Sequence, residues 1–363
     1  MSEANLALHL KQCIQKVATG PEYSKDLSYT EAYQAMQHIL TGAADPVQTA
    51  IYLIALRMKR ETDEENRGTL QALIDHSSIS QASVDELVDI SDPYDGFTRG
   101  VPASSFVPAV LAAMGVPTGI HGLASVGPKY GATHHKVLKA AGVNVTLTAQ
   151  QATAQLEQIG WTYIDQASFA PQLHALIPLR QRMIKRQILT TVETMLGPIR
   201  ARSKTHCMGG YVHKAYPPIY AALARQAGFQ TAMFVRGVEG GIIPSMQQAG
   251  RLFAYQDQGA EYQVDLAPQD LGIVAETRAV PLPPELVPAD DAIIDSDALA
   301  ARAAQLGLAA LAGERGLTYD SLVYACAICL SHLKRYPDLQ TAAAAVRSML
   351  DSGQALKVFK AAK

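Results

Sequence analysis

Leu87-Val-Asp-Ile90 is a short apolar run, and the turn Asp92-Pro-Tyr-Asp-Gly96 follows it almost at once. The same order of run and glycine turn returns twice: Val116 to Ile120 leads into His121-Gly122, and Thr231 to Val235 leads into Gly237. Further short runs and segments of helical spacing alternate with these, at 106–114, 137–141, 143–145, 148–159, 161–164 and 219–227. This alternation is typical of βα units. The sequence therefore predicts an α/β fold with a mostly parallel central sheet.

The first 80 residues show helical patterns alone. Ser28 with Glu31 and Thr62 with Glu65 are capping boxes, and Asp45-Pro46 opens the apolar helix between them. These signals predict a small all-helical N-terminal domain at 1–82, completed by helices within 170–196. The α/β domain then comprises 83–169 and 197–363 and ends in Ala-rich helices.

Composition bounds the class of protein. Of 363 residues, 48% are hydrophobic and 18% charged, which is typical of a folded globular protein, and the net charge of −2 gives no overall preference for polyanions. Four cysteines at scattered positions favour a reducing compartment over a disulfide framework. The N-terminus lacks the pattern of a secretory signal, and no long apolar run occurs. We expect a cytoplasmic protein without a membrane partner.

Positive charge gathers in one segment. Residues 180–214 contain eight Lys or Arg residues and one acid, Glu193, a net charge of +7. Arg180, Arg182, Lys185 and Arg186 crowd into one or two helical turns, a repulsion that favours a phosphorylated or polyanionic ligand. The alternative is a solvated helix face. His206 and His213 would add to the charge when protonated.

Three glycine turns at one sheet edge would let backbone N–H groups approach a phosphate. Together with the basic segment they give the candidate ligand- and phosphate-binding residues Asp95, Gly96, Arg99, His121, Gly122, Ser125, Lys129, Arg180, Arg182, Lys185, Arg186 and Glu239. The pairs His134-His135 and His206…His213 lack zinc-ligand spacing, so no metal site is predicted. No residue can be singled out as catalytic.

Several motifs carry a family resemblance. Ala55-Leu-Arg-Met-Lys-Arg-Glu-Thr62, Gly115-Val116 before His121-Gly122, Phe169-Ala-Pro171 and Leu196-Gly-Pro198 resemble anthranilate phosphoribosyltransferases in order and spacing. The resemblance spans nearly the whole chain. It implies a helical domain joined to an α/β domain, a cleft at the hinge, and a homodimer formed through the helical domain.

The family's catalytic motifs are altered. Ser91-Asp-Pro-Tyr-Asp95 replaces the Gly-Thr-Gly-Gly-Asp that holds the diphosphate of phosphoribosyl pyrophosphate, and Ile120-His-Gly-Leu-Ala124 replaces Lys-His-Gly-Asn-Arg. Ile242-Ile243 falls where the family's magnesium-binding Asp-Glu pair is expected. These departures resemble the family's non-tryptophan paralogues, some of which bind nucleic acid. That subgroup has counterparts of Pro93 to Gly96, of Arg180 to Arg186 and of Glu239-Gly240.

Two functions remain open. The first is a glycosyltransferase-fold binder whose basic cleft takes a phosphorylated small molecule or single-stranded nucleic acid, with ordinary anthranilate transfer lost and no cofactor assigned. The second is an active pentosyltransferase that uses phosphoribosyl pyrophosphate and magnesium with a different acceptor. A dimeric scaffold for an acidic protein is the third reading.

Overall fold

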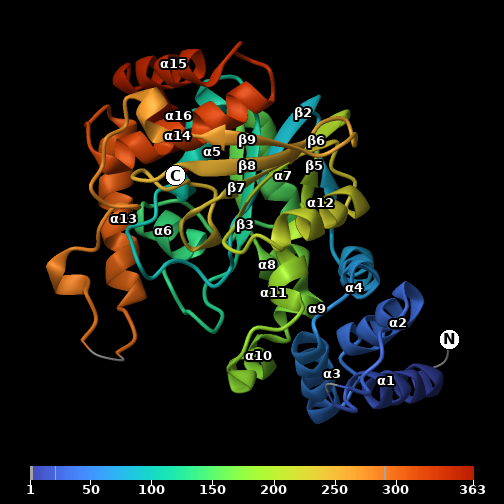
Figure 1. Cartoon of the computed structure of the whole chain (residues 1–363). Helices are drawn as coiled ribbons and strands as arrows, with labels where there is room; N and C mark the ends of the chain where they lie inside the picture. Colours follow the sequence, from blue (N-terminus) through green and yellow to red (C-terminus); the bar gives the residue numbers. More distant parts are fainter. Residues whose placement is uncertain (1–2, 21, 290–291) are drawn as a thin grey trace.

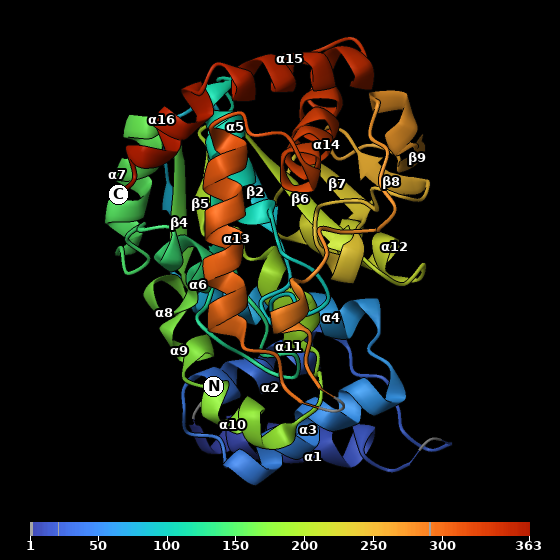
Figure 2. The same ribbon diagram turned by 90° about the vertical axis from the view of Figure 1, so that its left-hand side faces the viewer.

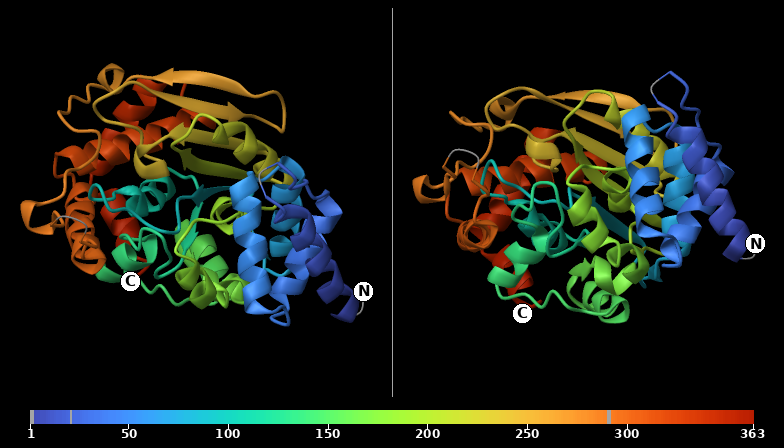
Figure 3. Two further views of the ribbon diagram at one scale, coloured as in Figure 1. Left: turned by 60° about the horizontal axis from the view of Figure 1, so that its bottom comes forward. Right: turned by 90° about the horizontal axis from the view of Figure 1, so that it is seen from below.

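The N-terminal part of the computed structural model is a bundle of helices, coloured blue in Figure 1. It consists of α1 (Glu3–Val17), α2 (Tyr29–Leu40), α3 (Pro46–Lys59) and α4 (Asp63–Asp75). The structure describes residues 3–20, 22–289 and 292–363; residues 1, 2 and 21 of the predicted helical domain and 290 and 291 of the predicted α/β domain lie outside these ranges. Figures 1 and 3 show α1 to α4 along one side of the molecule.

The predicted helix starts are confirmed. Ser28 and Glu31 form a complete capping box at α2, and Thr62 and Glu65 form another at α4. Asp45 caps α3, with a proline in the first turn. Each cap satisfies backbone N–H groups that the helix itself leaves unpaired, so these boundaries follow from local sequence.

A seven-stranded sheet forms the centre of the larger part, in the order β4-β3-β2-β6-β7-β8-β9. Its strands are β2 (Glu86–Ser91), β3 (Thr118–Gly122), β4 (Trp161–Asp165), β6 (Lys204–Tyr211), β7 (Thr231–Arg236), β8 (Gly250–Tyr255) and β9 (Tyr262–Leu266). The five strands β4, β3, β2, β6 and β7 run parallel, and β8 and β9 add an antiparallel edge. The short β1 (Ser80–Gln81) and β5 (Ile199–Arg200) pair separately. The predicted fold class is confirmed.

Helices cover both faces of this sheet. On one face lie α5 (Val107–Ala113), α6 (His134–Ala140), α13 (Ser296–Leu311), α14 (Leu317–His332), α15 (Leu339–Asp351) and α16 (Gln354–Lys360), several of which Figure 2 shows in front of the strands. On the other lie α7 (Ala149–Ile159), α8 (Gln166–Phe169), α9 (Pro171–His174), α11 (Leu189–Val192) and α12 (Tyr216–Gln226). Strand residues alternate between the two cores: Val88 and Ile90 join the first, and Leu87 joins the second.

One predicted strand is wrong, and three strands of the sheet were not predicted. Residues 143–145 form no strand; Val143 and Val145 are buried in the connection between α6 and α7, so their apolar character serves packing alone. Strand β6 was not predicted, because His206 and the pair Gly209-Gly210 interrupt its apolar pattern, although the His206 side chain is buried. The edge strands β8 and β9 were missed as well.

The basic segment is not one helix. α10 (Ile177–Met183) is followed by Ile184, which has a left-handed φ of 64°, and α11 begins only at Leu189. α10 packs on α3 and α11 on α4. This placement supports our proposal that 170–196 completes the helical domain. It also separates the basic side chains, which the sequence had suggested would share one helical surface.

The single tryptophan and the cysteines belong to the interior. Trp161 is fully buried and stacks on Phe359 with ring centroids 5.2 Å apart. The cysteines are free and buried, and burial raises the pKa of the Cys207 thiol to about 12. Within the described ranges, no helix combines the length and apolar character needed to cross a bilayer.

Two buried histidines should make the fold sensitive to mild acid. Burial lowers the pKa of His206 and of His332 from 6.5 to about 4. Between pH 6.5 and about pH 4 the two imidazoles are protonated in the unfolded chain and neutral in the folded chain. The free energy of unfolding therefore falls as the pH drops below about 6.5. At about 1.36 kcal/mol per pKa unit, each histidine lowers the free energy of unfolding by roughly 2 kcal/mol when the pH reaches about 5.

Urea denaturation across this pH range measures the effect. The variant His206→Gln has no titrating group at this position. Its free energy of unfolding should change with pH about half as steeply as that of the parent protein. Equal slopes for the two proteins would contradict the assignment.

Candidate functional site

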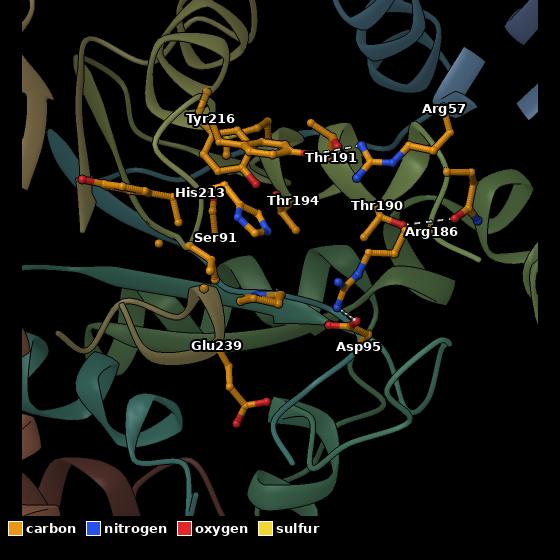
Figure 4. A pocket seen from close by; sticks show the side chains of 18 residues that line it. Arg57, Ser91, Asp95, Arg186, Thr190, Thr191, Thr194, His213, Tyr216 and Glu239 are labelled. Carbon is orange, nitrogen blue, oxygen red and sulfur yellow. Dashed lines mark hydrogen bonds and ion pairs between the residues drawn. The ribbon is translucent and has the colours of Figure 1, made fainter. Parts of the chain in front are cut away.

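A cavity opens where the carboxyl ends of β2 and β6 face α3, α12 and the segment 186–195. We call it the central cavity; it measures about 140 Å³. Its walls include Arg57, Ser91, Asp95, Arg186, Thr190, Thr191, Thr194, Tyr211, His213, Tyr216, Tyr220 and Glu239, several of which are labelled in Figure 4. Strand ends of a parallel sheet share one edge, so the chain brings its loops together here as the sequence predicted.

Asp95 and Arg186 meet across the cavity. An Arg186 Nη atom lies 2.7 Å from an Asp95 carboxylate oxygen, the contact dashed in Figure 4. The ammonium of Lys129 lies 3.2 Å from the other oxygen. Asp95 is buried, whereas the Arg186 side chain remains 46% exposed. The buried carboxylate is therefore balanced by two cations, and one of these can still reach an outside anion.

Glu239 ties two of the predicted loops together. Its carboxylate accepts hydrogen bonds from the backbone N–H groups of Thr98, at 3.1 Å, and Arg99, at 2.8 Å. Lys129 lies 3.7 Å away. Glu239 itself has a left-handed φ of 54°. The sequence placed Glu239, Lys129 and Arg99 in one site, and the structure brings them together, although the Glu239 carboxylate is already bound by the protein.

Aromatic rings line the side of the cavity formed by α12. The Tyr216 hydroxyl accepts a hydrogen bond from Arg57 at 2.9 Å. Ring centroids lie 5.4 Å apart for Tyr216 and Tyr220, and 6.2 Å apart for His213 and Tyr216. His213 is exposed and Tyr216 half-buried, so part of this ring cluster is open to a planar ligand.

His121 does not face the cavity, contrary to its prediction as a phosphate ligand. It is fully buried; its Nδ1 atom bonds the Tyr94 hydroxyl and its Nε2 atom lies 3.1 Å from Asp89. Ser91, which lines the cavity, hydrogen bonds to the same Asp89 carboxylate at 3.3 Å. Both nitrogens of the His121 imidazole have partners inside the protein, so the ring is not free to bind a ligand. Through Asp89 it helps to hold Ser91 in the cavity wall.

Arg180 is also unavailable to a ligand. Its guanidinium forms two hydrogen bonds of 2.7 and 2.6 Å to the carboxylate of Glu193, and both side chains are buried. The one acid of the basic segment therefore neutralises one of its bases. His206 is buried with its pKa lowered to about 4, so it adds no positive charge at neutral pH.

The other predicted residues take varied positions. Gly96 has a φ of 73°, and a Cβ there would lie 2.8 Å from the Ala132 backbone, so this turn requires glycine. Gly122 is buried at the end of β3. Arg182 and Lys185 belong to the basic segment and are exposed, but they do not line the central cavity. Ser125 is half-buried and also lies outside this cavity.

Sequence reasoning missed the residues that other elements contribute. Arg57 lies inside the quoted stretch 55–62, and Tyr216 and Tyr220 follow β6, which was not predicted; His213 was considered only for its charge and as a metal ligand. An aromatic pair spaced i, i+4 just after a basic His-Lys dipeptide was the available signal.

A magnesium diphosphate does not fit the residues present. Ile242 is fully buried, and its backbone N–H donates to Asp92. Glu239 is held by backbone donors. His134 lies 3.2 Å from Asp92, and His135 lies 2.7 Å from Asp165. Among residues 3–20, 22–289 and 292–363, no group of three or more His, Cys, Asp or Glu side chains is arranged to hold a metal ion.

The chain joins a helical bundle to a mostly parallel α/β unit, and each of these two parts matches a domain of one protein family. Residues 11–77 match the helical bundle domain of the glycosyl transferase family, and residues 99–356 match that family's a/b domain. The chain belongs to this glycosyl transferase family.

Individual relatives agree with this assignment. The anthranilate phosphoribosyltransferase of Desulfotalea psychrophila is 27% identical over 96% of this chain and 95% of the relative. An uncharacterized protein of Aquifex aeolicus is 28% identical over 65% of this chain and 70% of the relative. The structure of the Saccharomyces cerevisiae anthranilate phosphoribosyltransferase in complex with PRPP and Mg matches with a TM-score of 0.76 at 16% identity, covering 99% of this chain and 97% of that one. The enzyme from Thermus thermophilus matches with a TM-score of 0.72 at 19% identity over 97% of both chains. At these identities the structural matches establish the fold.

Proposed function

We propose that this protein binds a phosphate-bearing ligand, single-stranded nucleic acid in particular, along the central cavity and the exposed basic side chains beside it. Anthranilate is not its acceptor in this proposal. The observation that carries it is the interleaving of cations and rings: Arg57 and Arg186 share one cavity with Tyr216 and His213. Proteins that hold single strands combine these two features, because cations pair with the backbone and rings stack on bases.

Charge beyond the cavity supports the same ligand. Arg182, Lys185 and Lys214 are exposed, and no described residue forms an ion pair with them. Each exposed cation in contact with a backbone phosphate would release a counterion. A cavity of 140 Å³ is smaller than the usual pocket for a whole small molecule, about 300–1,000 Å³, which favours a ligand that lies partly along the surface.

Loss of anthranilate transfer is supported by the chemistry of the altered loops. Departure of a diphosphate needs fixed donors and a metal held by anionic oxygens. Pro93 contributes no N–H, Tyr94 is turned inward to His121, and the carboxylate of Glu239 is already bound. The remaining cations can hold a phosphate, but they supply no metal cage.

Titration calorimetry with a short oligothymidylate, beside phosphoribosyl pyrophosphate with and without magnesium, tests the proposal. We expect oligonucleotide binding that Tyr216→Ala weakens by about 1–3 kcal/mol, the value of one stacked base. Tyr23→Ala, which removes a 71% exposed ring from the N-terminal part, is the matched control. Absence of oligonucleotide binding would refute the proposal.

The second candidate is a pentosyltransferase that uses phosphoribosyl pyrophosphate with another acceptor. Its support is the shared fold with the yeast enzyme solved with PRPP and Mg, and the retained Asp95-Gly96 turn. Magnesium-dependent consumption of phosphoribosyl pyrophosphate by the unmodified protein would favour it. Turnover of anthranilate itself would overturn the binder proposal.

We further propose a homodimer formed through α3. Val47, Ile51 and Met58 of this helix are 64%, 41% and 77% exposed, an apolar surface that a second copy would cover. Light scattering should give twice the mass of one chain, which is 38.9 kDa. Ile51→Asp should give the single-chain mass with the fold retained. A single-chain mass for the unmodified protein at micromolar concentration would refute the dimer.

A further inference from the structure

A second and larger cavity lies next to the central one and is lined by three arginines. Arg99 follows β2, Arg236 ends β7, and Arg278 belongs to the connection after β9. We call it the arginine pocket. Its volume is about 570 Å³, within the range of about 300–1,000 Å³ found for small-molecule sites. The proposed function uses none of these three side chains.

The three guanidinium groups have no carboxylate partner among the described residues. Elsewhere Arg225, Arg251, Arg315 and Arg335 each lie within 2.5 to 3.2 Å of an acidic side chain, and all four of these pairs are at the surface. Arg99, Arg236 and Arg278 are exposed as well and form no such pair. Unpaired arginines around one hollow repel each other, and an anion between them removes that repulsion.

Glu239 is the one acidic side chain in the wall of the arginine pocket. Its carboxylate accepts hydrogen bonds from the backbone N–H groups of Thr98 and Arg99, and one of its oxygens lies 3.7 Å from the Lys129 ammonium, so other groups of the protein already share its charge. Three positive charges against one bound carboxylate leave the wall positive. The pocket therefore selects an anion.

Polar groups beside the arginines suit a phosphate. The Ser245 hydroxyl oxygen accepts from the backbone N–H groups of Gln247 and Gln248, which leaves its hydrogen free to donate. Ser245 and Gln248 both line the pocket. Guanidinium groups bind phosphate oxygens in pairs, through two parallel N–H donors, and a hydroxyl completes the oxygen's bonding.

We propose that the arginine pocket is a second phosphate-binding site, in which Arg99, Arg236 and Arg278 hold the phosphate group of a ligand. Val212 and Glu239 line both cavities, so the two sites are neighbours. The phosphate can belong to a small organic phosphate or to the backbone of a strand that leaves the central cavity. Only this second source rests on the proposed function.

Titration calorimetry of the full chain with inorganic diphosphate tests the site. Arg236→Ala/Arg278→Ala should lower diphosphate affinity at least tenfold, whereas Arg302→Ala, on α13 and outside both cavities, should leave it unchanged. Circular dichroism checks that each variant is folded.

Two oligothymidylates then identify the source of the phosphate. If a strand spans both sites, the double variant loses affinity for a long oligonucleotide and keeps it for a short one. If the ligand is small, diphosphate binding is lost and both oligonucleotides bind as before. Equal diphosphate affinity in the parent and the double variant, or no diphosphate binding at all, would overturn the proposal whether or not oligonucleotides bind.

Discussion

Replacing Arg182 and Lys185 together by alanine is expected to weaken oligonucleotide binding about 25-fold at about 0.1 M salt. Both side chains are exposed at the end of α10, and neither forms an ion pair within the described part of the chain. Each phosphate contact on a single strand contributes about 0.7 to the slope of log affinity against log salt, so losing two contacts flattens this slope by about 1.4. Fluorescence anisotropy at several salt concentrations measures both quantities.

The matched control is Lys357→Ala/Lys360→Ala. It makes the same change in net charge on α16, which Figure 2 shows at the opposite end of the molecule from α10. Its salt slope should equal that of the parent protein. An unchanged slope in the α10 variant, or an equal change in both variants, would remove the basic segment from the binding surface.

Replacing Arg180 by methionine should cost about 3–5 kcal/mol of unfolding free energy. The substitution leaves the Glu193 carboxylate buried, with Gln166 at 3.0 Å as its remaining side-chain partner. An unpaired buried charge is far more costly than the loss of a surface ion pair. Urea denaturation at neutral pH measures the loss.

One further variant and one further measurement separate the ion pair from simple packing. Arg180→Met/Glu193→Leu should recover most of the lost stability, since it removes both charges. Arg180→Met should keep the parent's salt slope for oligonucleotides, because its guanidinium faces Glu193. A loss below about 1 kcal/mol, or a flattened slope in a folded protein, would contradict this assignment.

Local signals in the sequence were sufficient for much of the fold. Ser28 with Glu31 and Thr62 with Glu65 specify helix starts through contacts three residues apart, so no tertiary information is needed. Strand β6 differs, because buried His206 and Cys207 obtain their environment from β2 and β7, and this environment depends on the assembled sheet.

The candidate site was predictable only in part. The turns that carry Asp95, Lys129 and Glu239 could be placed at one sheet edge, since parallel strands end together. The pairing of Arg180 with Glu193 could not, because the break at Ile184 folds the segment back on itself. A count of charges along the sequence treats every arginine as exposed. In the structure Arg180 is buried, whereas Arg182 and Arg186 are exposed to solvent.

The core on the second face of the sheet restricts how a ligand can enter the central cavity. This single apolar cluster joins Leu70 and Leu73 of α4 with Leu189 of α11 and with strand residues such as Phe234. Rotating the helical bundle as a rigid body away from the sheet would expose that cluster to water. We therefore expect the cavity to open without a hinge motion, by release of Arg186 from Asp95 and displacement of the short backbone segment between α10 and α11.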